Sequence, residues 1–306
     1  MIETPVLFAA FARPEYAKQT FNAIKKAKPK KFYFYSNKGR TDIPDEIERN
    51  NQVRALINDI DWDCELRTYF RDKYVDIYTS LWSAYDWIFE NEEQAIIFEE
   101  DCVPCLAFFD FCELLLPKYK DDWRIWVISG NNFFESFNPN GYDYIFTRFP
   151  FQYGWASWRN RWQKIERQNI PWEEMKRYEL NRQLYSLSRC KTNLLTKKEE
   201  KIFLFLKKNP AWDYTLGFTM KKEGAFGIIP AVNLVQNIGH IGEHDKGDKS
   251  IVHNKVTFSS DVFNIKNSPP FIVPDFKYDQ HLFFHMFYKR SSFFYRIWNK
   301  MLHILK

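Results

Sequence analysis

The sequence predicts an α/β protein built on a mostly parallel sheet flanked by helices, with a small helical tail at its C-terminus. Apolar runs of strand length alternate with amphipathic helical segments through the first hundred residues, which is typical of a doubly wound sheet. One run, Ala95 to Phe98, is continuously apolar, as expected for a strand covered on both faces. A hydrophobic content of 45% is sufficient for a sizeable core in a chain of 306 residues.

The first hundred residues contain strand and helix signals in strict alternation. Strands are expected at 6–11, 31–36, 64–69 and 95–98. Helices are expected from Pro14, from Pro44 to about Asn58, and from Ile77 to Ile88, where apolar residues recur at helical spacing. Neither a GxGxxG fingerprint nor a Walker motif accompanies these strands, which argues against a dinucleotide dehydrogenase or a P-loop NTPase.

The second half of the chain is less regular. Helices are expected at 108–119 and 212–220, strands at 123–129, 144–148, 227–230 and 233–236, and a loop at 237–244. The Lys-rich stretch from about 172 to 208 has weak periodicity and indicates solvated helices, as in an insertion or a lid. From about Pro269, Pro-rich extended chain gives way to a basic, aromatic segment that runs to Lys306. That composition fits either a helix lying in an anionic membrane interface or a helix docked on the body.

Net charge, cysteine content and the lack of long apolar runs indicate which ligands the protein binds and in which compartment it is found. The net charge of +5 favours anionic ligands or anionic membrane surfaces, and no nucleic-acid-binding motif is present. Five cysteines, an odd number, argue against a disulfide framework and favour buried thiols. The chain opens on a strand-like run rather than a signal peptide, and it has no apolar run of transmembrane length. We therefore expect a cytoplasmic protein, or one peripheral on the inner face of a membrane.

Three consecutive acids, Glu99, Glu100 and Asp101, follow the continuous apolar strand. In open α/β sheets, ligands bind just beyond the carboxyl ends of the strands. Acids gathered there repel one another unless a cation or a donor-rich ligand offsets their charge. Mg²⁺ and Mn²⁺ that hold phosphates are bound by one or two carboxylates together with phosphate oxygens and waters. The triplet therefore suggests a metal–diphosphate site, and a solvated acidic turn is the alternative.

Two further segments carry candidate site residues. In the block 151–162, Trp155 and Trp158 alternate with arginines beside Gly154, where backbone can approach closely. This block fits either a packed aromatic helix start or a wall for sugar rings, which Trp212 would extend. Asp213 lies near the start of the helix expected at 212–220, where a cap is the simple interpretation and a general base is the functional one.

Taken together, several stretches resemble a known family. These are LFAAFARPEYAKQTFNAI, WSAYDWIFENEEQAIIFEEDCVP, RFPFQYGWASWRNRW, WDYTL and NLVQNIGHIGEH. In this order they are similar to bacterial nucleotide-diphospho-sugar transferases of the GT-A (Rossmann-like) fold, related to the N-acetylglucosaminyltransferase I group. The resemblance spans roughly residues 5–255. It implies a GT-A domain over 1–268, with a nucleotide-binding half to about 101 and an acceptor half over 102–268, followed by the tail 269–306.

The resemblance also implies roles for single residues. The acidic triplet matches the family's metal motif, with Asp101 as the direct ligand of Mn²⁺ or Mg²⁺. Arg13 matches an arginine that contacts the nucleotide, and Asp213 matches the catalytic base. Asn37 and Lys38 stand where relatives offer an acid to the base of the nucleotide, so the base is left open. His244 stands where relatives carry a histidine near the metal and the diphosphate.

The function implied is a metal-dependent, inverting transfer of a sugar to a glycan or lipid-linked acceptor in surface polysaccharide synthesis. The donor would be a nucleotide-diphosphate sugar, with uridine as the expected base and N-acetylglucosamine as the sugar that the family suggests. Two alternatives stay open. One is a catalytically silent glycan- or lipid-binding protein of the same fold. The other is a sugar-phosphate nucleotidyltransferase, although FARPEY lacks the glycine-rich loop usual after the first strand of those enzymes.

Overall fold

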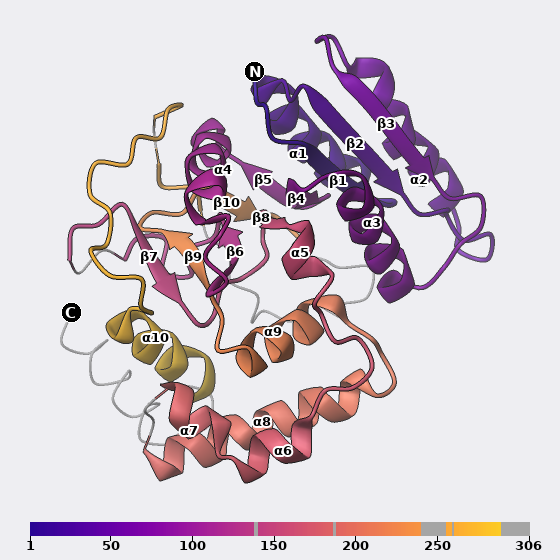
Figure 1. Cartoon of the computed structure of the whole chain (residues 1–306). Coiled ribbons are helices and arrows are strands. Elements are labelled where there is room, and N and C mark those ends of the chain that lie inside the picture. Colours follow the sequence, from indigo (N-terminus) through magenta and orange to yellow (C-terminus); the bar gives the residue numbers. More distant parts are fainter. Residues whose placement is uncertain (138–139, 186–187, 240–254, 259, 289–306) are drawn as a thin grey trace, which may run out of the picture.

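A computed structural model describes the chain except residues 138–139, 186–187, 240–254, 259 and 289–306. The described residues form an eight-stranded sheet with the order β3-β2-β1-β4-β8-β6-β9-β7 (Figure 1). Its strands are β1 (Val6–Ala10), β2 (Lys31–Ser36), β3 (Glu65–Phe70), β4 (Gln94–Glu99), β6 (Ile125–Ser129), β7 (Tyr144–Thr147), β8 (Trp155–Trp158) and β9 (Phe226–Pro230).

The expected α/β class with a mostly parallel sheet is confirmed. Strands β3, β2, β1 and β4 are all parallel, and β6 is parallel to β9. Two strands run the other way: β8 pairs antiparallel with both β4 and β6, and β7 pairs antiparallel with β9 at the edge. Strand β8 was not predicted from the sequence. Its insertion between β4 and β6 buries the β4 strand on both sides, with Ile96 opposite Ala156.

Helices cover both faces of the sheet and bury two separate apolar layers. On one face lie α1 (Pro14–Ala27), α2 (Glu46–Arg54), a 3₁₀ turn (Ala55–Asp59) and α4 (Leu106–Tyr119). On the other face lie α3 (Ile77–Asn91), α5 (Arg159–Trp162) and α9 (Trp212–Lys222). The periodicity expected for α1 is confirmed, since Ala17, Phe21 and Ile24 are fully buried.

Local sequence explains where several helices begin and end. Pro14 occupies the first turn of α1, where its missing N–H costs nothing. Asp76 caps α3, and its carboxylate accepts hydrogen bonds from the backbone N–H groups of Tyr78 and Thr79. Helix α4 ends at Tyr119, as expected, and contains Pro117 in its interior.

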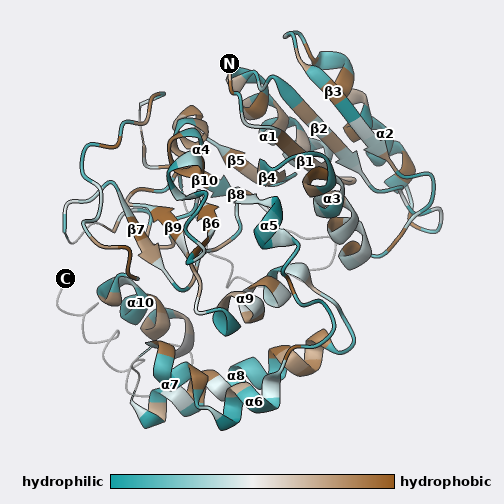
Figure 2. Cartoon of the chain, in the orientation of Figure 1, coloured by the Kyte–Doolittle hydropathy of each residue, from teal (hydrophilic) through white to brown (hydrophobic). Residues whose placement is uncertain are grey.

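The Lys-rich stretch forms a helical insert, α6 (Trp172–Arg177), α7 (Leu180–Tyr185) and α8 (Arg189–Leu206). Figure 1 shows these helices grouped apart from the sheet, with α9 between the insert and the strands. Figure 2 shows hydrophilic residues along the insert and hydrophobic residues along β6 and β9. The insert is not solvated throughout, since Asn181 and Glu199 are buried against Lys221 of α9.

The chain then returns to the sheet. A small antiparallel pair joins β5 (Cys102–Pro104) to β10 (Val235–Asn237). Helix α10 (Phe276–Phe283) continues into a π-helical turn (Phe284–Tyr288) and buries Tyr278 and Leu282 against Ile145 and Ile229.

Three expectations concern the tail, the membrane and the cysteines. The start of the tail is docked on the body through α10, whereas 289–306, with most of the expected interface helix, lie outside the described residues. Among the described residues, no helix combines the length and apolar character that a bilayer crossing requires. All five cysteines are free thiols, but the expected burial holds only for Cys102 and Cys112, because Cys64 and Cys105 are half-buried and Cys190 is exposed.

Candidate functional site

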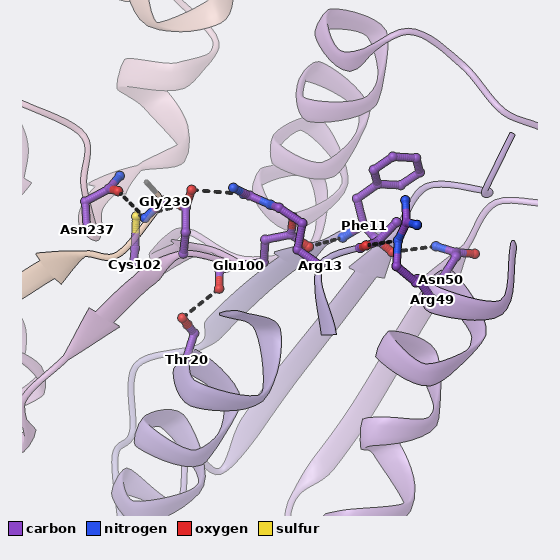
Figure 3. A network of polar contacts seen from close by, with 11 residues as sticks. Phe11, Arg13, Thr20, Arg49, Asn50, Glu100, Cys102, Asn237 and Gly239 are labelled. Atoms are coloured by element: carbon purple, nitrogen blue, oxygen red, sulfur yellow. Dashed lines mark hydrogen bonds and ion pairs between the residues drawn. The ribbon is translucent and has the colours of Figure 1, made fainter. Parts of the chain in front are cut away.

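An ion-pair network joins the carboxyl ends of β1 and β4. Arg13 lies between β1 and α1, and the guanidinium contacts two of the three acids that follow β4. Its Nε is 2.5 Å from Glu100 Oε1, and its Nη2 is 2.9 Å from Asp101 Oδ2 (Figure 3). In the described part of the chain, the remaining Nη1 makes no hydrogen bond. Arg13 is therefore held in place with one terminal nitrogen left for an anionic ligand.

Glu100 is the structural member of the acidic triplet. It is buried, and its carboxylate accepts hydrogen bonds from the backbone N–H of Phe11 (2.6 Å) and from Arg13. Its carbonyl accepts a hydrogen bond from the Thr20 hydroxyl of α1 at 2.9 Å. The carboxylate and the backbone carbonyl of Glu100 thus connect the end of β4 to β1 and to α1. The expected donor contact of Glu100 is indirect, because its carboxylate orients Arg13.

Glu99 lies in the electrostatic field of two other carboxyls, those of Asp101 and Asp213. The Tyr85 hydroxyl donates to Glu99 Oε1 at 2.9 Å. Burial, followed by the negative charge of Asp101 and with a further contribution from Asp213, raises the pKa of Glu99 to about 8. Asp213 follows the helical insert in the sequence and is more than a hundred positions from the acidic triplet, but the fold brings it within electrostatic reach of Glu99. A bound cation would lower the electrostatic cost of ionising all three groups.

Asp213 lies in the first turn of α9, but it does not cap the helix. The N-cap position belongs to Ala211, so the simple interpretation of Asp213 as a cap is wrong. Burial raises the pKa of Asp213, and the backbone N–H of Tyr214 partly opposes that rise. A half-buried carboxyl with a raised pKa, acting on the carboxyl of Glu99, is a candidate for proton transfer rather than for helix stability.

Asp101 is the acid best placed to hold a metal. Its carbonyl accepts the N–H of Ile238, and the backbone at Gly239 comes so close that an added Cβ would lie 2.3 Å from Asp101 Oδ2. The described residues contain no group of three or more His, Cys, Asp or Glu side chains gathered closely enough to hold an ion alone. The oxygen ligands fit Mg²⁺ or Mn²⁺ completed by phosphate oxygens and water. His244 lies outside the described residues.

The two residues expected to contact the base have different surroundings. Asn37 is buried, and its amide donates to the Val75 carbonyl at 2.7 Å while accepting the N–H groups of Lys38 and Val75. Asn37 thus fastens the end of β2 to the loop before α3. Its amide is occupied by that loop, which contradicts the expected base contact. Lys38 is half-buried beside it.

The expected tryptophan wall is wrong, because those rings form core. Trp155, Trp158 and Trp212 are 1%, 2% and 5% exposed. Trp155 stacks on Trp212 with ring centroids 5.2 Å apart, and Tyr85 packs edge-on against Trp212 at 4.8 Å. No ring face is left for a sugar. These rings instead fix the start of α9 and so the position of Asp213.

Gly154 precedes the buried tryptophans and has a positive φ of 64°. A side chain there would also clash with Val235, whose methyl carbons would lie 2.9 Å from an added Cβ. The close approach expected from the sequence is therefore present, but it serves the packing of β8 against β10.

Two contributors to this region were not identified from the sequence as site residues. The hydroxyl of Tyr85 donates the hydrogen bond to Glu99, whereas the helical spacing of Tyr85 in the sequence predicts only that it is a core residue of α3. Gly239 is recognisable as a loop glycine, but only the fold reveals its contact with Asp101.

A cavity of about 640 Å³ lies elsewhere, lined by Asp122, Trp123, Lys164 and neighbouring charged residues. These residues lie near the amino end of β6, which is parallel to β4 across the intervening β8. The cavity is therefore at the sheet edge opposite the acidic triplet.

Comparison with known proteins gives only remote similarities. No family model matches the chain, and no curated protein sequence matches it. Among solved structures, the mannosyltransferase PcManGT from Pyrobaculum calidifontis, in complex with GDP-Man and Mn²⁺, aligns with a TM-score of 0.33 and 9% identity. The alignment covers 53% of this chain and 46% of that one, so the match spans less than half of the mannosyltransferase.

Two other solved structures align with similarly low TM-scores and sequence identities. A UDP-glucose pyrophosphorylase complexed with UDP-glucose aligns with a TM-score of 0.40 and 7% identity, over 78% of this chain and 94% of that chain. The glycosyltransferase GlyE of Streptococcus pneumoniae aligns with a TM-score of 0.28 and 14% identity, over 61% of this chain and 41% of that chain. At TM-scores below 0.5, these similarities assign neither a fold family nor an activity to this chain.

Proposed function

We propose that this chain is an enzyme of nucleotide-sugar chemistry, namely a metal-dependent, inverting glycosyltransferase. The observation that carries the proposal is the ion pair of Arg13 and Asp101 at the carboxyl ends of β1 and β4, with the Asp213 carboxyl within electrostatic reach of the same acidic triplet. Arg13 and Asp101 are joined directly, and Asp213 acts electrostatically on the neighbouring Glu99. A guanidinium for the diphosphate, a carboxylate that would hold a metal and a carboxyl that would accept a proton are the groups that transfer from a diphosphate donor uses.

The donor side of the site would bind a diphosphate. Arg13 offers its free terminal nitrogen to a phosphate oxygen, while Glu100 holds the guanidinium in place. Asp101 would hold Mn²⁺ or Mg²⁺, whose charge, when bound, stabilises the negative charge that develops on the leaving diphosphate. Burial, together with the negative charge of Asp101, raises the pKa of the neighbouring Glu99, and a bound cation would oppose that rise.

Asp213 is the proposed general base. The acceptor hydroxyl oxygen forms a bond to the anomeric carbon of the donor sugar while the bond from that carbon to the diphosphate oxygen breaks. The electron pair of the broken bond leaves with the diphosphate, and the hydroxyl proton passes to the Asp213 carboxylate. Attack from the face opposite the leaving group inverts the anomeric centre.

The finer assignments are further parts of the proposal and rest on the sequence resemblance. They are a UDP-sugar as donor, N-acetylglucosamine as the transferred sugar, and a glycan or lipid-linked acceptor in surface polysaccharide synthesis. We also propose, from the sequence, that the basic tail contacts an anionic membrane from the cytoplasmic side.

A thermal-shift panel tests the proposal. UDP-, GDP-, CMP- and dTDP-sugars are each added with and without Mn²⁺, because a ligand that binds only the native state raises its Tm. We expect one nucleotide sugar to raise the Tm only when Mn²⁺ is present, which would also identify the base. No shift with any donor would reject the proposal in favour of a silent glycan- or lipid-binding protein.

A further inference from the structure

Three aromatic side chains from three helices meet beside Asp213. Tyr78 belongs to the first turn of α3, Phe205 to the last turn of α8, and Tyr214 to the first turn of α9. Phe205 lies between the two tyrosines, with ring centroids 6.3 Å from Tyr78 and 6.2 Å from Tyr214, both packed edge to face. These three residues are called the aromatic platform below.

The aromatic platform is accessible, unlike the buried tryptophans. Phe205 is 40% exposed and Tyr214 is 43% exposed. In the described part of the chain, the hydroxyls of Tyr78 and Tyr214 make no hydrogen bond. The platform therefore offers apolar ring surface together with two phenol groups that are free to donate or accept.

The aromatic platform is continuous with the proposed base. Tyr214 follows Asp213 directly in α9. Burial, together with the negative charge of Asp213, raises the pKa of Tyr78, which places Tyr78 within the field of that carboxyl although it comes from α3. A ligand resting on these rings would thus have its polar groups close to Asp213.

Buried anchors hold the three helices together under the aromatic platform. The indole N–H of Trp82 in α3 donates to the Pro210 carbonyl at 2.7 Å, which ties the chain between α8 and α9 to α3. Trp212 stacks on Trp155 in the core and fixes the start of α9. The rings are therefore presented by a rigid base, as a binding surface requires.

We propose that Tyr78, Phe205 and Tyr214 form the acceptor subsite, on which the apolar face of a glycan ring rests with a hydroxyl directed at Asp213. Sugars combine apolar C–H faces with polar rims, and tyrosines match them with an apolar ring and a polar tip. This inference rests on the proposed function, because it names the acceptor of the same site as a carbohydrate. It also makes the helical insert part of the site, since Phe205 comes from α8.

Direct glycan binding tests the subsite. Saturation-transfer NMR is measured on the full chain with N,N′-diacetylchitobiose, lactose, cellobiose and mannobiose. We expect at least one disaccharide to bind the wild type, and Phe205→Ala or Tyr214→Ala to weaken that binding at least tenfold. Phe205→Tyr keeps the ring and should restore binding. Tyr178→Ala is the matched control, because Tyr178 is a 68%-exposed tyrosine of the same insert outside the platform.

Two results would overturn the subsite: no disaccharide binds the wild type, or the alanine variants bind as the wild type does. The nucleotide-sugar thermal shift, measured on the same samples, separates this failure from that of the proposed function. A normal donor shift without glycan binding rejects the platform alone. Glycan binding that depends on the platform, without any donor-induced Tm shift, rejects the transferase but still shows that the aromatic platform binds glycans. Circular dichroism confirms that each variant is folded.

Discussion

At the scale of single residues, the proposed chemistry depends most on Asp213. The isosteric change Asp213→Asn removes the proton acceptor and keeps the shape of the side chain. We expect transfer to fall by at least about 10²-fold, the usual contribution of a general base, while donor binding is retained. Initial rates of transfer and the donor-induced Tm shift measure the two effects. Full activity in Asp213→Asn would remove Asp213 as the base.

Gly239 tests the position of Asp101 without altering its carboxylate. Gly239→Ala places a methyl group 2.3 Å from Asp101 Oδ2, so the carboxylate must move. We expect Mn²⁺-dependent donor affinity to fall while the Tm of the free protein changes little, since Gly239 is half-exposed at a loop.

A glycine of α9 provides the control for Gly239→Ala. An added Cβ at Gly217 meets nothing within 4 Å, and the residue is exposed in the helix. Gly217→Ala should therefore leave donor affinity unchanged and raise the free energy of unfolding by about 0.5–1 kcal/mol, because alanine favours helix over glycine. Wild-type donor affinity in Gly239→Ala would contradict the placement of Asp101 at the donor.

At the scale of elements, the helical insert is joined to α9 by a buried polar cluster. Lys221 of α9 contacts Glu199 of α8, and its ammonium also donates to the Asn181 amide oxygen at 2.9 Å. Lys221→Met leaves Glu199 buried without a cation, which should lower the free energy of unfolding by roughly 3 kcal/mol. The double variant Lys221→Met/Glu199→Met should recover most of that loss, as measured by urea denaturation. Additive losses in the double variant would show that the two residues do not act as a pair.

Helix α10 carries a carboxyl whose titration should be visible in stability. Burial raises the pKa of Asp279 to about 7 from the ordinary 3.8, although the Thr147 hydroxyl donates to it at 2.6 Å. The folded protein thus binds this proton more tightly than the unfolded chain does, so Asp279 stabilises the fold at low pH. That stability is lost as pH rises from about 4 to about 7, and the loss is roughly 4 kcal/mol at most.

Asp279→Asn has no such titration. We expect the difference in unfolding free energy between Asp279→Asn and the wild type to increase in favour of the variant between pH 5 and pH 8. Urea denaturation at several pH values measures it. A constant difference over that range would show that Asp279 does not change its protonation there.

At the scale of the whole molecule, the parallel half of the sheet was predictable because its signals are local. The strands β1, β2 and β4 contain continuous apolar or aromatic runs of four or five residues, and amphipathic helical segments lie between the strands along the chain. Strand β8 was missed because Trp155–Trp158 is short, and its strand character comes from pairing with β4 and β6. Those partners lie far away in sequence, where no periodicity can reveal them.

The site was predictable only in part, and for the same reason. Arg13 and Asp101 follow predicted strands, so topology alone places both at one sheet edge. Whether a tryptophan is core or surface depends on what packs against it, and for Trp155 that includes Trp212, far along the chain. The aromatic platform combines residues of α3, α8 and α9, and no local motif joins them.

The proposed metal–donor site is tested most directly by the binding of a nucleotide sugar to wild type and to Asp101→Asn, measured by calorimetry with and without Mn²⁺. The donor is the one identified by the thermal-shift panel. We expect Mn²⁺ to strengthen binding to the wild type by at least tenfold and to have no effect on Asp101→Asn, with both proteins equally folded. Equal enhancement by Mn²⁺ in the two proteins would contradict the central claim, because the metal would then be held without Asp101.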